Sequence, residues 1–313
     1  MTGSVADFSL RDQYSTTRLA LYALAAAALA IVVAGFWNFH LVDGFGRDVI
    51  AGRTIGDTGT LAGAFGERGL TFGFVFAGVA GLAATFTACN CVVFAMLPGL
   101  ACSTDGKTGQ SSPWFALAAF VGGVAVVSIA YGLYIGSIGS AGVEALNVRE
   151  VRLAQAQWVF TGIGVVMLVW GLGEMGLFDG VTRRLSGSAR TFLASASTKA
   201  ATIGILVGLF SVGRPFPVFR EFLTYAAEAG SPLYGAAVMA IQGIGQILVM
   251  VALFALLVWL GGRKLLAWSR SNPAGPRLMS GLALVAGGAF FVFYWGLAFA
   301  FDIGRWGFKL GWY

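Results

Sequence analysis

Long apolar runs separated by short polar segments dominate this chain. Seven of these runs lie at 19–39, 71–97, 114–138, 157–178, 195–228, 233–261 and 279–301. An α-helix needs about 20 apolar residues to cross the hydrocarbon core of a bilayer, so each run is long enough to span it. The pattern predicts an all-α polytopic membrane protein with about seven transmembrane helices.

The composition supports this fold class. Hydrophobic residues make up 58% of the chain, charged residues 11%, and the mean hydropathy is +0.81. Soluble domains have roughly a quarter of their residues charged. Membrane lipid is therefore the predicted environment. The net charge of +6 is explained by basic loops at one membrane face, so no nucleic-acid partner is expected.

The basic residues also predict an orientation. Arg11 and Arg18 precede the first run, which resembles a secretory signal, but we expect it to be retained as an anchor. Two further clusters fall on the same side, Arg183/Arg184/Arg190 and Arg263/Lys264/Arg270/Arg277. The positive-inside rule makes this side cytoplasmic. The expectation is a bacterial inner-membrane protein with a cytoplasmic N-terminus and a periplasmic C-terminus.

Five segments follow from the runs. They are an N-terminal tail with the first transmembrane helix (1–40), an external loop (41–69), a first three-helix repeat (70–180), a second (181–301) and an external tail (302–313). The loop 41–69 has no obvious regular structure but contains apolar residues. We expect it to lie on the membrane surface or to cap the bundle.

The two triplets of helices are expected to form an inverted repeat. Each triplet opens with an interrupted span, the first near Cys89-Asn90-Cys91 and Pro98-Gly99, the second at Arg214-Pro215-Phe216-Pro217. An odd number of helices per unit makes successive units enter the membrane from opposite sides. In transporters this arrangement places the working site at the midplane, where broken helices meet.

All three cysteines, Cys89, Cys91 and Cys102, lie within fourteen residues. On a continuous helix, Cys89 and Cys91 would point roughly 200° apart and could not bridge. A turn at Pro98-Gly99 would allow Cys102 to reach either of them. Three interpretations stay open: redox or thiol exchange, inert packing, and metal binding, for which the single histidine, His40, leaves too few ligands. We predict no metal and no resident cofactor.

Arg214 is the most notable charge predicted within the membrane. A guanidinium near the bilayer centre costs several kcal/mol unless it is paired or hydrated, and Glu174 and Glu221 are the expected partners. The arginine is either part of a site, where it would also favour a thiolate, or half of an ion pair that fixes helix packing. Gln242 and Gln246, four residues apart, share a helical face and either line the same cavity or hold helices together.

The residues around the cysteines resemble a known family. Thr85-Phe86-Thr87-Ala88-Cys89-Asn90-Cys91, running into Leu97-Pro98-Gly99, is similar to the first reactive helix of the DsbD/CcdA transmembrane electron-transfer proteins. Gly213-Arg214-Pro215-Phe216-Pro217, followed by the helix with Gln242-Gly243-Ile244-Gly245, is similar to the second. The resemblance covers about 70–301 and implies transfer of reducing equivalents between a cytoplasmic thioredoxin and periplasmic thiol proteins, through one cysteine in each repeat.

One departure from this pattern constrains the mechanism. The second family cysteine would fall at about Phe216, so the usual bridge between the repeats is impossible. The altered first motif and the additional first span most resemble a membrane-protein branch of the methylamine-utilisation proteins. That resemblance implies a role in maturing methylamine dehydrogenase, with a thioredoxin-like periplasmic protein, another membrane maturation protein and an exported dehydrogenase subunit as partners.

Three functions remain from the sequence. The chain is a thiol-disulfide carrier for an exported partner, without a classical enzyme active site; a small-solute transporter with an anion site at Arg214; or a scaffold without chemistry. The motifs of c-type haem attachment, phosphate-binding loops, zinc hydrolases and serine hydrolases are absent. ATPase and hydrolase functions are therefore excluded.

Overall fold

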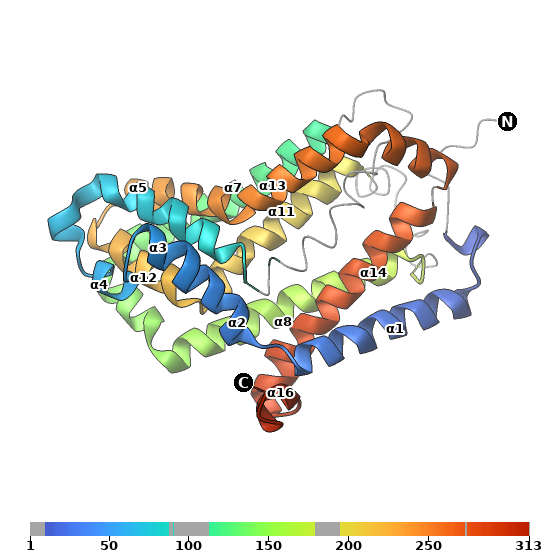
Figure 1. The fold of residues 1–313 in the computed structure, drawn as a ribbon, viewed down its shortest axis with the longest axis horizontal. Helices are drawn as coiled ribbons and strands as arrows, with labels where there is room; N and C mark the ends of the chain where they lie inside the picture. The colour runs from blue at the N-terminus through green and yellow to red at the C-terminus, as the bar shows by residue number, and fades with distance from the viewer. Residues whose placement is uncertain (1–9, 88–89, 91–112, 179–194, 273, 313) are drawn as a thin grey trace.

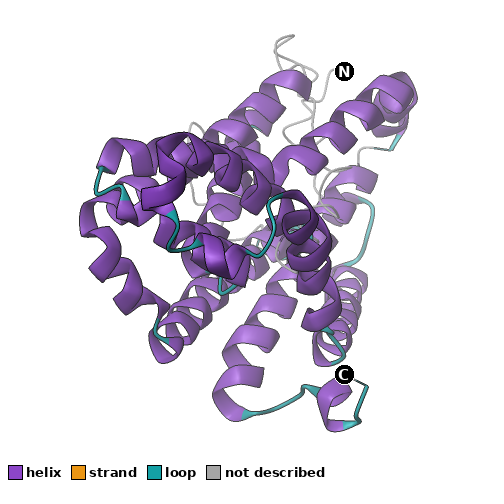
Figure 2. Ribbon diagram, turned by 60° about the vertical axis from the view of Figure 1, so that its left-hand side comes forward, coloured by secondary structure: helices purple, strands orange, loops and turns teal. Residues whose placement is uncertain are grey.

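The computed structural model describes residues 10–87, 90, 113–178, 195–272 and 274–312 (Figure 1). Across these ranges the regular elements are helices, as Figure 2 shows, and no strand occurs. The long helices are α1 (Thr16–Gly35), α5 (Phe65–Ala84), α7 (Pro113–Asn147), α8 (Arg149–Glu174), α11 (Ala196–Gly213), α12 (Pro217–Glu228), α13 (Pro232–Ser271) and α14 (Ala274–Phe291). The π-helix η4 (Val292–Ala298) and the short α15 (Phe299–Phe301) continue α14.

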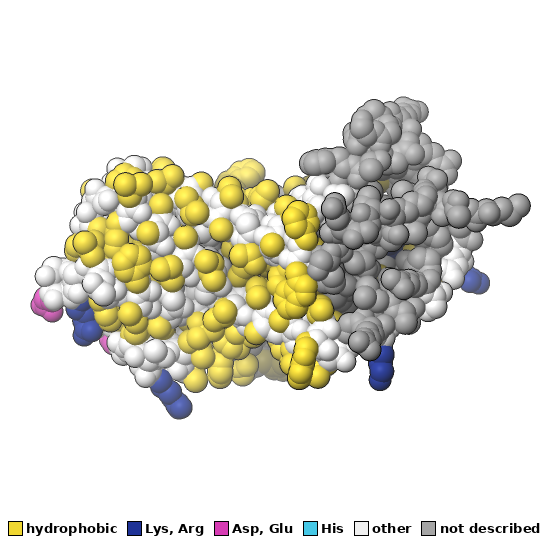
Figure 3. Space-filling model, turned by 90° about the horizontal axis from the view of Figure 1, so that it is seen from above, with side chains coloured by type: hydrophobic (Ala, Val, Ile, Leu, Met, Phe, Trp, Pro, Cys, Tyr) yellow, Lys and Arg dark blue, Asp and Glu magenta, His cyan; other side chains and the backbone are white. Residues whose placement is uncertain are grey.

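Five helices in the described part are long and apolar enough to span a membrane, or six if α11 and α12 count as one broken span. The sequence predicted about seven. The remaining predicted span, 71–97, runs beyond α5 into residues that the structure does not describe. On the face shown in Figure 3, hydrophobic side chains cover the broad middle and charged side chains lie near its ends and lower edge. The polytopic all-α fold is thus confirmed.

Several helix boundaries differ from the predicted ones. α5 ends at Ala84 instead of continuing to 97. α7 continues to Asn147, with a kink at Gly139, whose φ of 64° is accessible to glycine. α8 begins at Arg149, so the long α7 and α8 are joined by Val148 alone and no loop separates them.

The segment between α1 and α5 is helical, which corrects the expectation of a loop without regular structure. It consists of α2 (Phe39–Gly44), the π-helix η3 (Phe45–Ala51), α3 (Gly52–Thr54) and α4 (Thr58–Leu61). We call these four helices the cap, and the end of the molecule that they cover the cap end (Figure 1). The cap contacts α5 and α12 of the bundle.

Gly46 brings the cap close to the bundle. A Cβ atom placed on Gly46 would lie within van der Waals contact of the Ala83 carbonyl group and 3.4 Å from Cζ of Phe216. Phe45 packs edge-on against Phe86, with ring centroids 4.9 Å apart. Ala51, on the same π-helix, is completely buried. The cap is therefore packed tightly onto the bundle, and the small size of Gly46 permits that contact.

The C-terminal segment packs on α1. The helix α16 (Trp306–Lys309) places the indole of Trp306 directly over Gly35, where any Cβ would collide with it. Phe36 lies between two indoles, with ring centroids 5.7 Å from Trp306 and 5.2 Å from Trp312. The first and last membrane-spanning helices are thus held together at one end, in agreement with their contacts along α1 and α14.

Glycine pairs mark the closest helix contacts. Gly81 of α5 lies against Gly245 of α13, and Gly123 of α7 lies against Gly204 of α11. The two contacts correspond to each other: the chain separation between Gly81 and Gly204 equals that between Gly123 and Gly245 to within one residue. Gly164 of α8 and Gly288 of α14, separated by almost the same length, face each other. Small residues of this kind let helix backbones approach closely in membranes.

Candidate functional site

The predicted interruption of the fifth span is present. α11 ends at Gly213 and α12 begins at Pro217, and the two helices are bent by 81°. Arg214 is extended (φ −69°, ψ 118°), as the residue before a proline prefers, and Pro217 occupies the first turn of α12, where its missing N–H leaves nothing unsatisfied. We call residues 214–216 the break. The alternation of prolines in the sequence thus specifies it locally.

Two buried arginines organise the break. Arg214 has 1% of its surface exposed and Arg220 has 3%. The Nε of Arg220 donates a hydrogen bond to the carbonyl oxygen of Arg214 at 2.7 Å, and its Nη2 donates to Oε1 of Gln155 on α8 at 3.3 Å. The guanidinium of Arg214 lies 5.9 Å from the ring centroid of Phe219. Arg220 therefore satisfies a carbonyl group freed by the break and ties α12 to α8.

The end of α5 faces the same region. The hydroxyl of Thr85 donates to the carbonyl oxygen of Gln246 on α13 at 3.0 Å. The side-chain amide of Asn90 donates to the carbonyl oxygens of Ala84 at 2.9 Å and Gln246 at 3.3 Å, and the Thr87 hydroxyl also donates to Ala84. These side chains satisfy a carbonyl group that a continuing helix would pair with a backbone N–H, which explains why α5 ends early.

The two glutamines lie between these elements. Gln246 is buried, and its Oε1 accepts a hydrogen bond from the hydroxyl of Ser211, one turn before the break, at 3.3 Å. Gln242 is also completely buried, and among the described residues neither of its side-chain polar atoms has a hydrogen-bond partner. Buried amides normally find partners or water. Gln246 thus connects α13 to α11, whereas Gln242 adds unsatisfied polarity to the interior.

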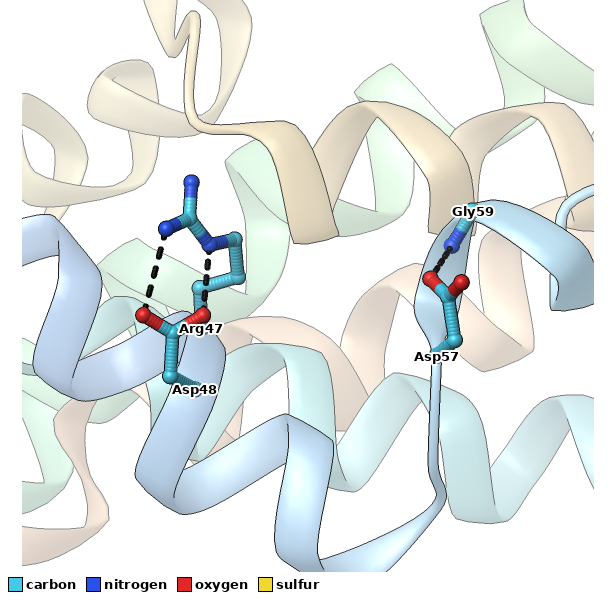
Figure 4. Close-up of polar contacts among 4 residues, drawn as sticks. All are labelled: Arg47, Asp48, Asp57 and Gly59. Carbon is cyan, nitrogen blue, oxygen red and sulfur yellow. Dashed lines mark hydrogen bonds and ion pairs between the residues drawn. The ribbon is translucent and has the colours of Figure 1, made fainter.

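Asp43 of the cap is the carboxylate whose charge responds to Arg214. Burial raises the pKa of Asp43 to about 6 from 3.8, although the positive charges of Arg214 and then Arg47 act to lower it. Arg47 itself binds Asp48 through Nε and Nη2, at 2.7 and 3.1 Å (Figure 4). That hydrogen bond lowers the pKa of Asp48. The cap therefore brings charged groups to the break that the sequence analysis did not include.

The two glutamates expected near Arg214 contact other charged groups. Glu174 forms an ion pair with Lys199 of α11 and accepts a hydrogen bond from Nε1 of Trp170 at 3.2 Å. Glu221 is beside the cap, where its Oε1 is 3.8 Å from the position of a Cβ on Gly59, and its charge acts on Arg47. Gly59 is in α4, and its N–H donates a hydrogen bond to Oδ1 of Asp57 at 2.9 Å (Figure 4). The helical spacing of residues in the sequence does not specify which neighbouring group each glutamate contacts.

Cys89, Cys91 and Cys102 lie outside the described residues, as do Pro98 and Gly99. The break contains Arg214, Pro215 and Phe216, and Pro217 follows it directly. Gln246 contacts the end of α11 before the break through its hydrogen bond with Ser211. Among the residues that the structure describes, no group of three His, Cys, Asp or Glu side chains could hold a metal ion.

Sequence reasoning missed Asp43 and the role of Thr85. One signal for Asp43 was available. Asp43 and Arg47 are four residues apart, which is typical of charged pairs on one face of a helix. Thr85 left no signal of its own, because its partner carbonyl groups on α13 are more than 150 residues away in the chain.

Neither a curated protein nor a solved structure matches the chain. A family does match it: the cytochrome c biogenesis protein transmembrane region, over residues 73–296. The matched range begins within α5, contains the break, and includes the helices that pack around it. The chain therefore belongs to the family of cytochrome c biogenesis protein transmembrane regions.

Proposed function

We propose that this chain is an inner-membrane thiol-disulfide carrier that assists the maturation of an exported enzyme, with methylamine dehydrogenase as the specific client. Membership of the family supports thiol redox transfer and thioredoxin-like partners. The altered first motif and the additional N-terminal span support the methylamine-utilisation branch. The N-terminus would be cytoplasmic and the C-terminus periplasmic.

The observation that carries the proposal is the placement of Asn90. Asn90 separates Cys89 from Cys91 in the sequence, is 4% exposed, and is bonded to Gln246 of α13. The same residue of α13 bonds Ser211, next to the break. The cysteine motif is therefore anchored through its central residue to the helix that also contacts the second interruption.

The glycine pairs support the inverted repeat. The separation that relates Gly81 to Gly204 also relates Cys91 to Arg214. Phe216 falls two positions beyond. Neither residue is a cysteine, so no register within one or two residues restores a bridge between the repeats. Thiol chemistry in this chain must use Cys89, Cys91 and Cys102 with each other or with a partner.

The exchange itself balances simply. A thiolate of the chain attacks one sulfur of a partner's disulfide and releases the other as a thiolate. A second thiol of the chain then attacks the mixed disulfide. Two thiols of the chain become one disulfide while the partner's disulfide becomes two thiols, so two electrons and two protons pass to the partner. The reverse sequence applies when the partner is the donor, and a thioredoxin-like protein resets the carrier.

Asp43 bears on the alternative of anion transport. A transporter that uses Arg214 to bind an anion needs the positive charge of Arg214 for that anion. The carboxyl group of Asp43 already interacts electrostatically with this charge. This arrangement favours a structural or thiol-activating role for Arg214 over anion binding. A scaffold without chemistry would retain full activity when all thiols are replaced.

Replacement of the cysteines tests the proposal. Cys89→Ser, Cys91→Ser and Cys102→Ser chains are expressed with the dehydrogenase genes, and the disulfides of the exported subunit are counted by a mass-tagging thiol reagent. We expect Cys89→Ser or Cys91→Ser to leave thiols unpaired in the client. Full maturation by a chain lacking all three cysteines would overturn thiol transfer and leave the scaffold. Defective maturation of other exported disulfide proteins, with normal dehydrogenase, would overturn the client assignment alone.

A further inference from the structure

A second pair of arginines lies close together near the cap end, on α8 and α12. Arg152 is in the first turns of α8 and is half-buried, and its positive charge acts directly on the buried Arg220 of α12. Among the described residues, neither arginine forms an ion pair with a carboxylate. The partly buried Lys199, by contrast, is paired with Glu174. Two like charges in a medium of low dielectric repel each other strongly unless a negative group lies between them.

Unused hydrogen-bond donors accompany this charge. Within the described part of the chain, Nη1 of Arg220 and Nε of Arg152 are buried and have no hydrogen-bond partner. The hydroxyl of Tyr131 on α7, which is close enough to Arg220 to influence its charge, is also buried. Each unsatisfied buried donor costs about 1–3 kcal/mol, and more for a charged group. Their convergence indicates a missing acceptor.

Gln155 fixes the geometry on the α8 side. Its Oε1 holds Nη2 of Arg220 at 3.3 Å, so the guanidinium is orientated before any ligand arrives. Nε of the same guanidinium is held by the carbonyl oxygen of Arg214. The guanidinium of Arg220 is therefore held in one orientation, and in the described structure its Nη1 makes no hydrogen bond. Arg152 and Gln155 are only partly buried, so a ligand can approach the two arginines from the surface of α8.

We propose that Arg152 and Arg220, together with Tyr131, form a binding site for a phosphate group near the cap end of the bundle. Guanidinium groups match the geometry of phosphate oxygens and bind them through charge-assisted hydrogen bonds. The amino-terminal end of α8 adds a favourable partial positive charge. The phosphate is either a free anion or the headgroup of an anionic lipid, because the site lies near the ends of membrane-spanning helices. The proposal does not depend on the thiol chemistry proposed above.

Thermal unfolding of the full chain in a neutral detergent tests binding, with inorganic phosphate as the probe and chloride at matched ionic strength as the reference. Phosphate should stabilise the wild type, and Arg152→Gln should weaken the apparent affinity by about tenfold or more, equivalent to about 1.4 kcal/mol. Arg149→Gln is the matched control. It removes the same charge one turn earlier on α8, at an exposed position, and should bind phosphate like the wild type.

The order of stabilities provides a second readout. Without phosphate, Arg152→Gln should be at least as stable as the wild type, since a repulsive charge is removed. With phosphate the order should reverse. The hydrogen bond that Arg152 makes in the described structure runs from its backbone N–H to the carbonyl oxygen of Val148. Glutamine can also make this bond, so this variant should fold. Arg220→Lys, which keeps the charge but loses the fork, should bind more weakly than the wild type.

Nanodiscs separate the two sources of phosphate. In discs of phosphatidylcholine, stabilisation by inorganic phosphate identifies a site for a free anion. Stabilisation on adding phosphatidylglycerol, lost in Arg152→Gln but kept in Arg149→Gln, identifies a lipid headgroup site. Equal responses of all variants to both probes, or no response of the wild type to either, would overturn the proposal.

Discussion

The side-chain amide of Asn90 donates a hydrogen bond to the backbone carbonyl oxygen of Gln246, 156 residues further along the chain. This contact joins the central residue of the cysteine motif to the helix that also supports the break. The position of Asn90 therefore depends on α13 as well as on α5.

Asn90→Ala should detach this residue from α13. Two hydrogen bonds to buried carbonyl groups are lost, so we expect the free energy of unfolding to fall by about 1–3 kcal/mol. If the thiols act at this site, their rate of reaction with a water-soluble thiol reagent should change as well. Unchanged thiol reactivity together with unchanged stability would show that Asn90 does not anchor the motif.

Docking of the cap should depend on pH through Asp43. Its pKa is about 6 in the docked cap against an ordinary 3.8, so the docked form holds a proton more tightly than an undocked, solvated form. Docking is then strongest below 3.8 and weakens as the pH rises through about 6. The measurement uses a chain without native cysteines that carries Ala51→Cys at a buried position or Arg53→Cys at an exposed one. The labelling rate of Ala51→Cys is divided by that of Arg53→Cys at each pH. This ratio should rise across the range.

Asp43→Asn serves as the control for that experiment. The amide cannot ionise, so the labelling ratio should become independent of pH, and the cap should stay docked. A pH-dependent ratio in this variant would assign the effect to another group.

One methyl group should loosen the cap. Gly46→Ala drives a Cβ into the Ala83 carbonyl group, whereas Gly63→Ala, on the neighbouring exposed turn, meets nothing within 4 Å. We expect Gly46→Ala to increase labelling of Ala51→Cys by about tenfold or more, equivalent to about 1.4 kcal/mol of docking energy, and Gly63→Ala to leave it unchanged. Labelling of Met167→Cys, deep in α8, should stay low in both; a rise there would mean general unfolding.

The contact between α5 and α13 offers a second matched pair of glycines. A Cβ on Gly81 would collide with the carbonyl oxygen of Gln242, but a Cβ on Gly78, one turn earlier, would meet only a methyl group at 3.9 Å. Gly81→Ala should lower the free energy of unfolding by about 1–3 kcal/mol, and Gly78→Ala should change it by less than about 1 kcal/mol. Denaturant unfolding in mixed micelles measures both, and equal effects would contradict the close approach.

The Glu174–Lys199 pair should matter for stability at the opposite end. The Glu174 and Lys199 side chains are only 10% and 20% exposed. Lys199→Met leaves a buried carboxylate alone and should cost about 3–5 kcal/mol. Adding Glu174→Gln should recover most of the loss, because it removes the uncompensated charge. A double variant as unstable as the single one would indicate that packing, not charge, is responsible.

The sequence predicted the parts of this fold that depend on local or composition-level physics. Apolar length identified the spans, and the prolines at 215 and 217 located the break to the residue. The end of α5 could not be predicted in the same way, because Thr85 and Asn90 terminate the helix through carbonyl groups on α13. Nor could the pairing of Glu174 with Lys199 be predicted, since helical spacing specifies a face but not the helix that the face meets.

The cap also constrains the order in which the molecule can be completed. Gly46 rests against Phe216, which is synthesised 170 residues later, and chains are made from the N-terminus. When the cap has left the ribosome, α12, which forms part of the surface that buries the cap, does not yet exist. The apolar residues of the cap, Ala51 and Leu61 among them, must wait at the membrane surface or with a chaperone until α12 is in place. Closure of the cap is therefore a late step of assembly, and it reports that the broken helix has formed.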